Sequence, residues 1–388
     1  MALRDLLPLI TEDPAAVALG REGGHAFASA SLRPYLIAAL AEIDPQTAAR
    51  AQLVVVGDDR AARDLAADLR AWLAPRRVRY YPSRGVAYES HLVPPPHLTG
   101  LRMAALDALL AAGPDVRGNP QDSQRSSPLV VVSAAALAEK VPDPALRPLS
   151  FTLRVGELLD LEECARELAD AGYERVDQVE ERGQFAVRGG LLDVFPATED
   201  RAVRVDMFDL QIESLRWFST FTQRSLGEVE EVEIAPAAEL SAEHRAAALL
   251  AASGNGANDA AGPAEDPAGR PDIADLLPVG RFRALLELIG EQTELVVAAE
   301  EELAPALRDH WGDVCAALGK ENADHLYVSP ESITAALGRR ARIWLSAISG
   351  KQPIALRAQS ADTAARSLAE AEPELEKLLR SGLSLIHI

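Results

Sequence analysis

Cysteine and long apolar runs are both scarce in this 388-residue sequence. Cys164 and Cys315 are its only cysteines, too few for a disulfide framework, so we expect a reducing, cytoplasmic environment. No run of roughly 18 or more apolar residues occurs, and we therefore expect neither a transmembrane helix nor a membrane partner. Residues 1–14 carry acids and lack a basic flank followed by an apolar core, which argues against a secretory signal.

Basic residues are also few. The chain has 39 Lys and Arg against 59 Asp and Glu, a formal net charge of −20, and its first lysine is Lys140. Non-specific DNA binding draws most of its affinity from Lys and Arg that neutralise phosphates. A surface this acidic should repel duplex DNA, so a protein or small molecule is the better expectation for a partner.

Recognisable catalytic and metal-binding patterns are missing as well. The histidines are scattered singly, none at the spacing of a zinc site, and no G-x-S-x-G sequence occurs. Acids cluster at Glu228, Glu230, Glu231 and Glu233 in a strand-like run, which predicts a solvated edge whose charge blocks pairing with another strand. The sequence therefore predicts no catalytic residue and no metal site.

A glycine cluster near the start invites comparison with a phosphate loop, G-x-x-x-x-G-K-[ST]. Laid over that pattern from Gly20, the second glycine position holds His25, the lysine position Ala26 and the hydroxyl position Phe27. Three interpretations remain: a working ATP site, a plain turn before a helix, or a phosphate loop that has lost its chemistry. We favour the third, a degenerate loop formed by Gly20, Gly23, Gly24, Ala26 and Phe27 that binds no cofactor.

The patterning of residues 1–150 predicts an α/β domain. Apolar runs at 53–56, 78–81 and 129–132 are typical of buried strands, and helical stretches follow the first and the last of these runs. Continuous apolar strands that alternate with helices indicate a parallel sheet covered on both faces.

Residues 151–245 are patterned differently. Apolar and polar side chains alternate at 185–188, 191–195, 203–208 and 212–218, which predicts an antiparallel meander inserted in the chain after one helix at about 157–171. Residues 246–272 are rich in Gly, Ala, Pro and Asp and predict a flexible linker. The α/β pattern resumes over 273–350, and 351–388 begin a further domain.

Three blocks carry a family resemblance. The first runs from Tyr81 to Glu89 and continues through Pro94–His97 to Leu101-Arg102; it resembles a block shared by UvrB and the transcription-repair coupling factor family. The second, 172–180 and 183–196, is similar to the core of the UvrB interaction domain, which docks on UvrA. The third, 205–216, completes that domain.

The chain is identified as a member of the coupling-factor family because UvrB keeps an intact phosphate loop and a following aromatic β-hairpin, and neither is found here. The resemblance extends to about residue 382 and implies a UvrB-like α/β domain, 1–150 and 273–350, with the interaction domain inserted. It also implies UvrA recruitment for transcription-coupled nucleotide excision repair.

In the full-length family, RNA polymerase, duplex DNA, ATP and magnesium are bound by later domains, so the chain is expected to end inside the next domain and not to be an enzyme itself. Two alternatives stay open. One is a UvrB-like, ATP-dependent DNA-damage-binding enzyme with an atypical nucleotide site; the other is a purely structural α/β domain.

The resemblance also suggests partner-binding residues: Arg175, Arg188 and Phe195. Period-two alternation points Arg188 away from Phe185 and Val187. The competing interpretation pairs the two arginines with Asp177 or Glu180 on the surface, and Phe195, just before Pro196, could equally belong to the core.

Overall fold

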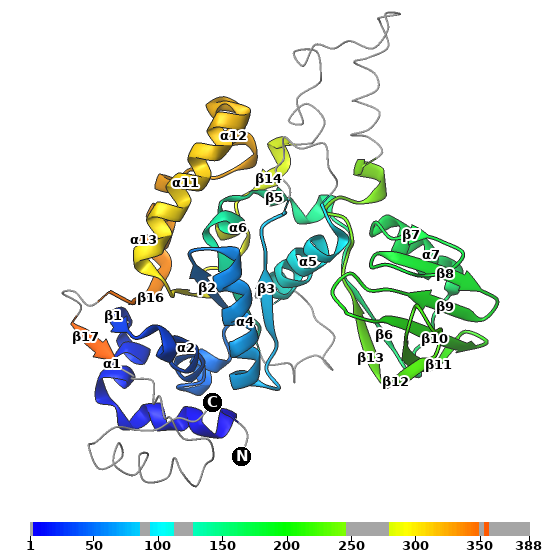
Figure 1. Ribbon diagram of the computed structural model, residues 1–388, viewed down its shortest axis with the longest axis horizontal. Helices are drawn as coiled ribbons and strands as arrows, with labels where there is room; N and C mark the ends of the chain where they lie inside the picture. The colour runs from blue at the N-terminus through cyan, green and yellow to red at the C-terminus, as the bar shows by residue number, and fades with distance from the viewer. Residues whose placement is uncertain (1–2, 86–93, 112–126, 246–278, 349–352, 357–388) are drawn as a thin grey trace, which may run out of the picture.

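The computed structural model describes residues 3–85, 94–111, 127–245, 279–348 and 353–356. These residues form two bodies, an α/β domain and a smaller, mainly antiparallel domain joined to it (Figure 1). The predicted linker at 246–272 and most of 351–388 lie outside the described residues, as do Val86–Glu89 of the first resemblance block.

The α/β domain is built on a parallel sheet in the order β17-β1-β16-β15-β2-β4-β3, and all of its pairings are parallel. Every residue of the central strands β2 and β4 is buried, as their continuous apolar sequences predict. The strands are β1 (Gly24–Ala28), β2 (Gln52–Val56), β3 (Val78–Tyr81), β4 (Leu129–Ser133), β15 (Glu294–Val297), β16 (Ala341–Ser346) and β17 (Ile354–Leu356).

Helices cover both faces of this sheet, each face with its own apolar core. One face packs against a 3₁₀ helix (Leu3–Glu12), α1 (Pro14–Glu22), α2 (Arg33–Ala41) and α4 (Asp59–Leu73). The other packs against α5 (Pro96–Ala111), α6 (Ala134–Ala138), α10 (Leu285–Leu288), α11 (Glu300–Leu318) and α13 (Pro330–Arg340). Two further helices, α3 (Pro45–Ala48) and α12 (Lys320–Leu326), lie among the connections. The predicted fold class is confirmed.

Local sequence explains where these helices begin. Asp58 ends the turn that follows β2. Its carboxylate accepts a hydrogen bond from the Ala61 N–H at 2.8 Å and caps α4, which starts at the next residue. Ser133 caps α6 in the same way, through the Ala136 N–H at 3.1 Å.

The smaller domain is a sheet in the order β12-β11-β10-β9-β8-β7, antiparallel except between β7 and β8. Its strands are β7 (Glu174–Arg175), β8 (Gln184–Arg188), β9 (Leu191–Val194), β10 (Ala202–Phe208), β11 (Gln211–Phe218) and β12 (Ser225–Val229). The predicted meander is present. One face packs on α7 (Leu161–Asp170) and on the strand pair β6 (Phe151–Arg154) and β13 (Glu231–Ile234). The helix begins later than the sequence predicts because Asp160 caps it.

This domain is an insertion in the α/β domain. The chain leaves after α6, passes through β5 (Val141–Pro142) and enters the insertion along β6. It comes back along β13, the antiparallel partner of β6, and Phe282–Arg283 (β14) then pairs with β5. Entry and exit therefore run side by side.

The structure corrects the interpretation of the glycine cluster. A phosphate loop follows a strand and leads into a helix, but Gly20 lies inside α1 and Gly24, Ala26 and Phe27 lie in β1, so here a helix leads into a strand. Gly23 has φ +75°, and a Cβ there would lie 2.4 Å from the Arg342 carbonyl oxygen, so that position requires glycine for packing. The strand-to-helix turn comes later, at residues 29–32.

The structure also corrects the interpretation of the acid run. Glu231 and Glu233 lie on β13, whose pairing with β6 is intact, and they contact arginines of both domains. They are therefore not a bare solvated edge. Glu228 and Glu230 are exposed, as predicted.

Candidate protein-interaction site

The outer face of the small domain's sheet, opposite α7, carries a row of charged side chains. Strand pairing sets Asp193 of β9 opposite Arg204 of β10, and Arg204 opposite Arg216 of β11. Two residue pairs further along, Asp206 lies opposite Ser214. Because side chains alternate between faces, these residues project together on the side away from the apolar core.

Asp193 holds the row in place. Its carboxylate, only 4% exposed, accepts two hydrogen bonds from Arg204, at 2.7 and 2.8 Å, and one from Arg188 at 3.1 Å. Those hydrogen bonds raise the pKa of Arg204 above its ordinary value. The Arg204 guanidinium also lies 4.7 Å from the centre of the Phe218 ring. Because this buried carboxylate accepts hydrogen bonds from both arginines, it fixes the direction of their side chains.

Asp206 repeats this arrangement at the next position. It accepts hydrogen bonds from Ser214 at 2.7 Å and from the Arg216 Nε at 3.0 Å. The outer face therefore alternates Arg188, Asp193, Arg204, Asp206 and Arg216, which we name the arginine ladder. The like-charged Arg204 and Arg216 are directly opposite, and the two aspartates offset the repulsion that this position would cause.

The structure brings two of the three predicted partner-binding residues together. Arg175 on β7 and Arg188 at the end of β8 line one open hollow, together with Val176, Asp177, Gln178 and Val187. Within the part of the chain that the structure describes, Arg175 makes no ion pair, and Arg188 bonds Asp193 while its side chain stays 52% exposed.

Phe195 lies apart from this hollow. It is half-buried in a small apolar cluster with Val179, Ala186 and Phe218, and the Arg182 guanidinium lies 5.6 Å from its ring centre. The side chain can still contribute to a surface, but packing within the domain is its main role here.

Sequence reasoning missed the rest of the ladder and two apolar neighbours. Leu191 and Phe208, which is 73% exposed, project from the same face as Asp193 and Asp206. The alternation Val203-Arg204-Val205-Asp206 carried the signal, because it sets two charges on the face away from the core. What the sequence did not reveal is which arginine each aspartate holds.

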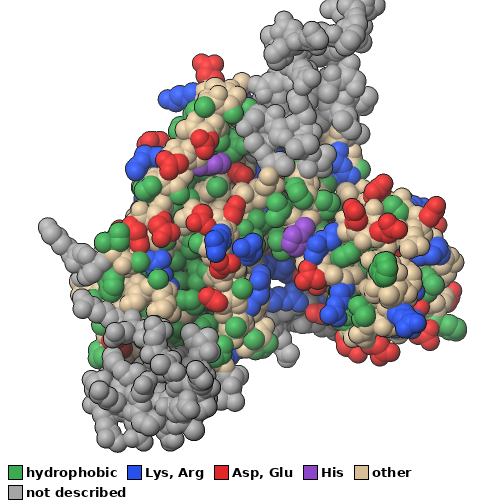
Figure 2. All heavy atoms as spheres, in the orientation of Figure 1, with side chains coloured by type: hydrophobic (Ala, Val, Ile, Leu, Met, Phe, Trp, Pro, Cys, Tyr) green, Lys and Arg blue, Asp and Glu red, His purple; other side chains and the backbone are tan. Residues whose placement is uncertain are grey.

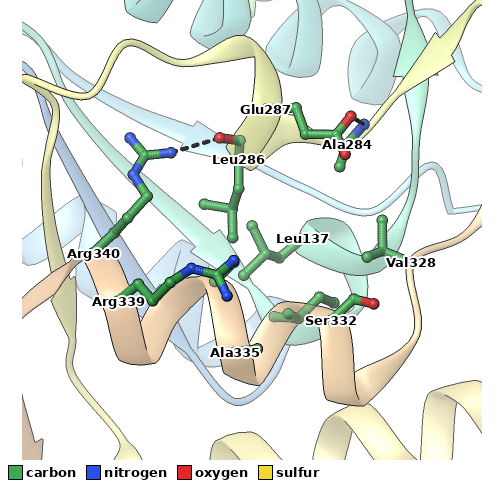
Figure 3. Close-up of a pocket in the computed structure, with 11 residues that line it drawn as sticks. Leu137, Ala284, Leu286, Glu287, Val328, Ser332, Ala335, Arg339 and Arg340 are labelled. Carbon is green, nitrogen blue, oxygen red and sulfur yellow. Dashed lines mark hydrogen bonds between the residues drawn. The ribbon is translucent and has the colours of Figure 1, made fainter.

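A second hollow lies in the α/β domain between α6, α10 and α13, with a volume of about 380 Å³ (Figure 3). Leu137, Val328 and Ile333 make its wall apolar, and Arg340 is held by the carbonyls of Leu286 at 2.5 Å and Gly290 at 2.8 Å. Its lining holds one carboxylate, Glu287, and one hydroxyl, Ser332, with no histidine or cysteine among them. Among the described residues no group of His, Cys, Asp and Glu could hold a metal ion, and no helix is long and apolar enough to cross a membrane.

Comparison with known families decides what the inserted domain is. Residues 151–240 match the family model of the UvrB interaction domain. These residues are therefore similar to UvrB interaction domains, and we call them the UvrB interaction domain after this match.

The chain is also similar to transcription-repair-coupling factors. Identity is 35% over 205 residues with that of Mycobacterium bovis, 36% over 202 with that of Myxococcus xanthus and 29% over 180 with that of Bacillus subtilis. These matches cover 52%, 50% and 46% of this chain but only 15%, 16% and 14% of the relatives. The resemblance to the coupling-factor family is confirmed over these residues, which span a small part of each relative's length.

Proposed function

We propose that the chain recruits UvrA in transcription-coupled nucleotide excision repair, through the outer face of its UvrB interaction domain. The observation that carries this proposal is the exposed Arg188 at one end of an arginine ladder that is already held in position, with the exposed Arg175 lining the same hollow. The similarity to transcription-repair-coupling factors supports the same process.

The ladder has the properties of a binding surface for a protein. Arginine is enriched at interface hot spots because its planar group makes directed, charge-assisted bonds. Asp193 orders Arg188 and Arg204 before any partner arrives, which lowers the entropy lost on binding. Leu191 and Phe208 add exposed apolar surface beside the charges. UvrA would thus meet the face with carboxylates or carbonyls around an apolar contact.

We assign the remaining activities of a full-length coupling factor to other parts of that protein. Binding of RNA polymerase and of duplex DNA, and the use of ATP with magnesium, are proposals for those parts and not for the residues described. The chain is then a recruiting module without catalysis of its own.

The recruiting role predicts that replacing Arg175 and Arg188 together with alanine weakens UvrA binding at least about tenfold, since one hot-spot arginine typically contributes about 2 kcal/mol. Both side chains are surface-exposed, so the melting temperature should change by no more than a few degrees. Surface plasmon resonance with purified UvrA measures the first effect and calorimetry the second.

Arg166→Ala is the matched control. Arg166 is equally exposed but lies on α7, across the sheet from the ladder, and its loss should leave UvrA affinity unchanged. If the double variant stays folded and binds UvrA as tightly as the parent, the ladder is not the recruiting face.

We further propose that the chain has no working nucleotide site. In open α/β sheets ligands bind beyond the carboxyl ends of the strands, where neighbouring crossovers diverge. In this sheet the position in question lies beyond the carboxyl ends of the neighbouring strands β1 and β16. There, Arg33 of α2 forms an ion pair with Glu301 of α11 at 3.0 Å. The Ala347 N–H also donates to Glu301, at 2.8 Å.

Glu301 is held as a carboxylate. Burial would raise its pKa, but the backbone N–H groups of Glu301 and Ala347, Ser346 and Arg33 together lower it. The edge where phosphates would lie thus carries an ion pair, and residues 29–32 supply neither a lysine nor a glycine. Isothermal calorimetry with ATP and magnesium should give no measurable heat of binding; a dissociation constant in the micromolar range would instead support the alternative of a UvrB-like ATP-dependent enzyme.

A further inference from the structure

The contact between the two domains is built around one buried carboxylate. Glu239 follows β13 at the end of the UvrB interaction domain, and its side chain is 8% exposed. It accepts a hydrogen bond from Arg84 Nε at 3.0 Å and another from Arg102 Nε at 3.2 Å. Both arginines belong to the α/β domain, so the pairing joins the domains directly.

Glu139, at the end of α6, completes the cluster from the α/β side. It accepts from Arg102 at 2.5 Å and from the backbone N–H of Arg84 at 3.1 and 3.2 Å. Arg102, on α5, has a fully buried side chain, donates to the Pro82 carbonyl at 2.8 Å and lies 4.8 Å from the centre of the Tyr81 ring. Two arginines and two glutamates thus contact one another inside the interface.

Close packing surrounds these charges. A Cβ added to Gly100 of α5 would lie 2.5 Å from the Ala197 Cβ of the UvrB interaction domain. One turn earlier, His97 Nδ1 lies 2.9 Å from the Ala197 carbonyl oxygen. Gly183 approaches Pro96 in the same way, since a Cβ added to this glycine would lie 3.0 Å from the Pro96 Cβ. The first turns of α5 therefore fit the inserted domain in one arrangement.

A second set of ion pairs lies further out. Arg79 of β3 bonds Glu233 at 2.6 Å, and Arg77 reaches Glu231 at 3.2 Å. In Figure 2, Lys and Arg side chains gather where the two domains face each other. Arg77 and Glu231 are both about two-fifths exposed, so solvent and salt reach this outer pair.

We propose that Arg84 and Arg102 form a socket for Glu239 that fixes one orientation of the UvrB interaction domain on the α/β domain. Removing one partner of a buried ion pair leaves the other charge uncompensated, so the socket is costly to break. The outer pair Arg77–Glu231 adds little because exposed ion pairs are weak and screened. This gives the block from Tyr81 to Arg84, and Arg102 with it, a positioning role rather than a chemical one.

The orientation can be measured in the whole chain by electron–electron double resonance. Spin labels go on cysteines at Arg60 of α4 and Glu213 of β11, both exposed, with Cys315 changed to serine and the buried Cys164 left in place. The parent should give one narrow distance distribution. Glu239→Gln, which keeps the shape but removes the charge, should lose that single peak and spread over longer distances.

The matched control is Glu231→Gln, which removes the charge of the exposed outer pair and should keep the narrow peak of the parent. A narrow, unshifted peak in Glu239→Gln overturns the socket. If circular dichroism finds that variant unfolded, Arg84→Gln tests the same contact from the other side. Should both unfold, the parent in about 1 M salt decides, because salt screens the outer pairs and not the buried ones: a narrow peak supports the socket and a broad one overturns it.

Discussion

Replacing Asp193 with alanine should lower the local stability of the UvrB interaction domain by about 3 kcal/mol, because it leaves Arg204 and Arg188 without the carboxylate that holds them. The value lies at the low end for a buried ion pair, since Arg204 keeps some contact with water. Native-state hydrogen exchange of the β9 and β10 amides measures this loss directly. UvrA affinity should fall as well, because the arginines lose their fixed direction.

Asp200→Ala is the control for this experiment. Asp200 also pairs with an arginine, Arg182, but it is 91% exposed, so its loss should cost no more than a few tenths of a kcal/mol. If the β9 and β10 amides are equally protected from hydrogen exchange in the two variants, the arginine ladder does not contribute to the stability of the domain.

Glu139→Gln should remove a large pH dependence of stability. Burial raises the pKa of Glu139 from 4.5 to about 7; Arg102 and Arg84 act against this shift, and Glu239 adds to it. A carboxyl whose pKa rises on folding contributes stability below its unfolded pKa, and that contribution is lost as the pH rises through about 7. The shift corresponds to about 3 kcal/mol across this window.

Urea unfolding of parent and variant from about pH 5 to about pH 8 measures the effect. The stability of Glu139→Gln relative to the parent should increase with pH and level off above about 7. Glu239→Gln provides the opposite sign at lower pH: burial would raise the pKa of Glu239, but Arg84 and Arg102 lower it below 4.5, so its contribution is constant over this range and is lost only as the pH falls below 4.5. A difference between Glu139→Gln and the parent that does not change with pH would contradict this account.

The sequence predicted most of the architecture because burial leaves a direct mark on it. The runs at 53–56 and 129–132 are apolar throughout, and they became the central strands β2 and β4. Alternation at 203–208 predicted β10 and its two faces. In β1, by contrast, the sequence Gly-His-Ala-Phe-Ala is neither continuously apolar nor rich in strand-forming residues. The glycines in and before it therefore suggested a phosphate loop, whereas in the structure α1 leads directly into β1.

The parts that could not be predicted depend on residues far apart in sequence. Arg102 and Glu239 are 137 positions apart and meet only because the inserted domain folds back against α5. Arg77 and Glu231 meet across 154 positions for the same reason. Local patterns indicate that a side chain is polar or faces outward, but the partner of a buried charge follows from tertiary packing.

The antiparallel pairing of β6 with β13 has a consequence for how this protein can change. Phe151 lies opposite Ile234, so the first and last strands of the inserted domain are hydrogen-bonded neighbours. A domain with adjacent ends can be lengthened, exchanged or removed without parting the strands of its host. The parallel sheet could therefore keep its own fold while different domains were inserted between β6 and β13.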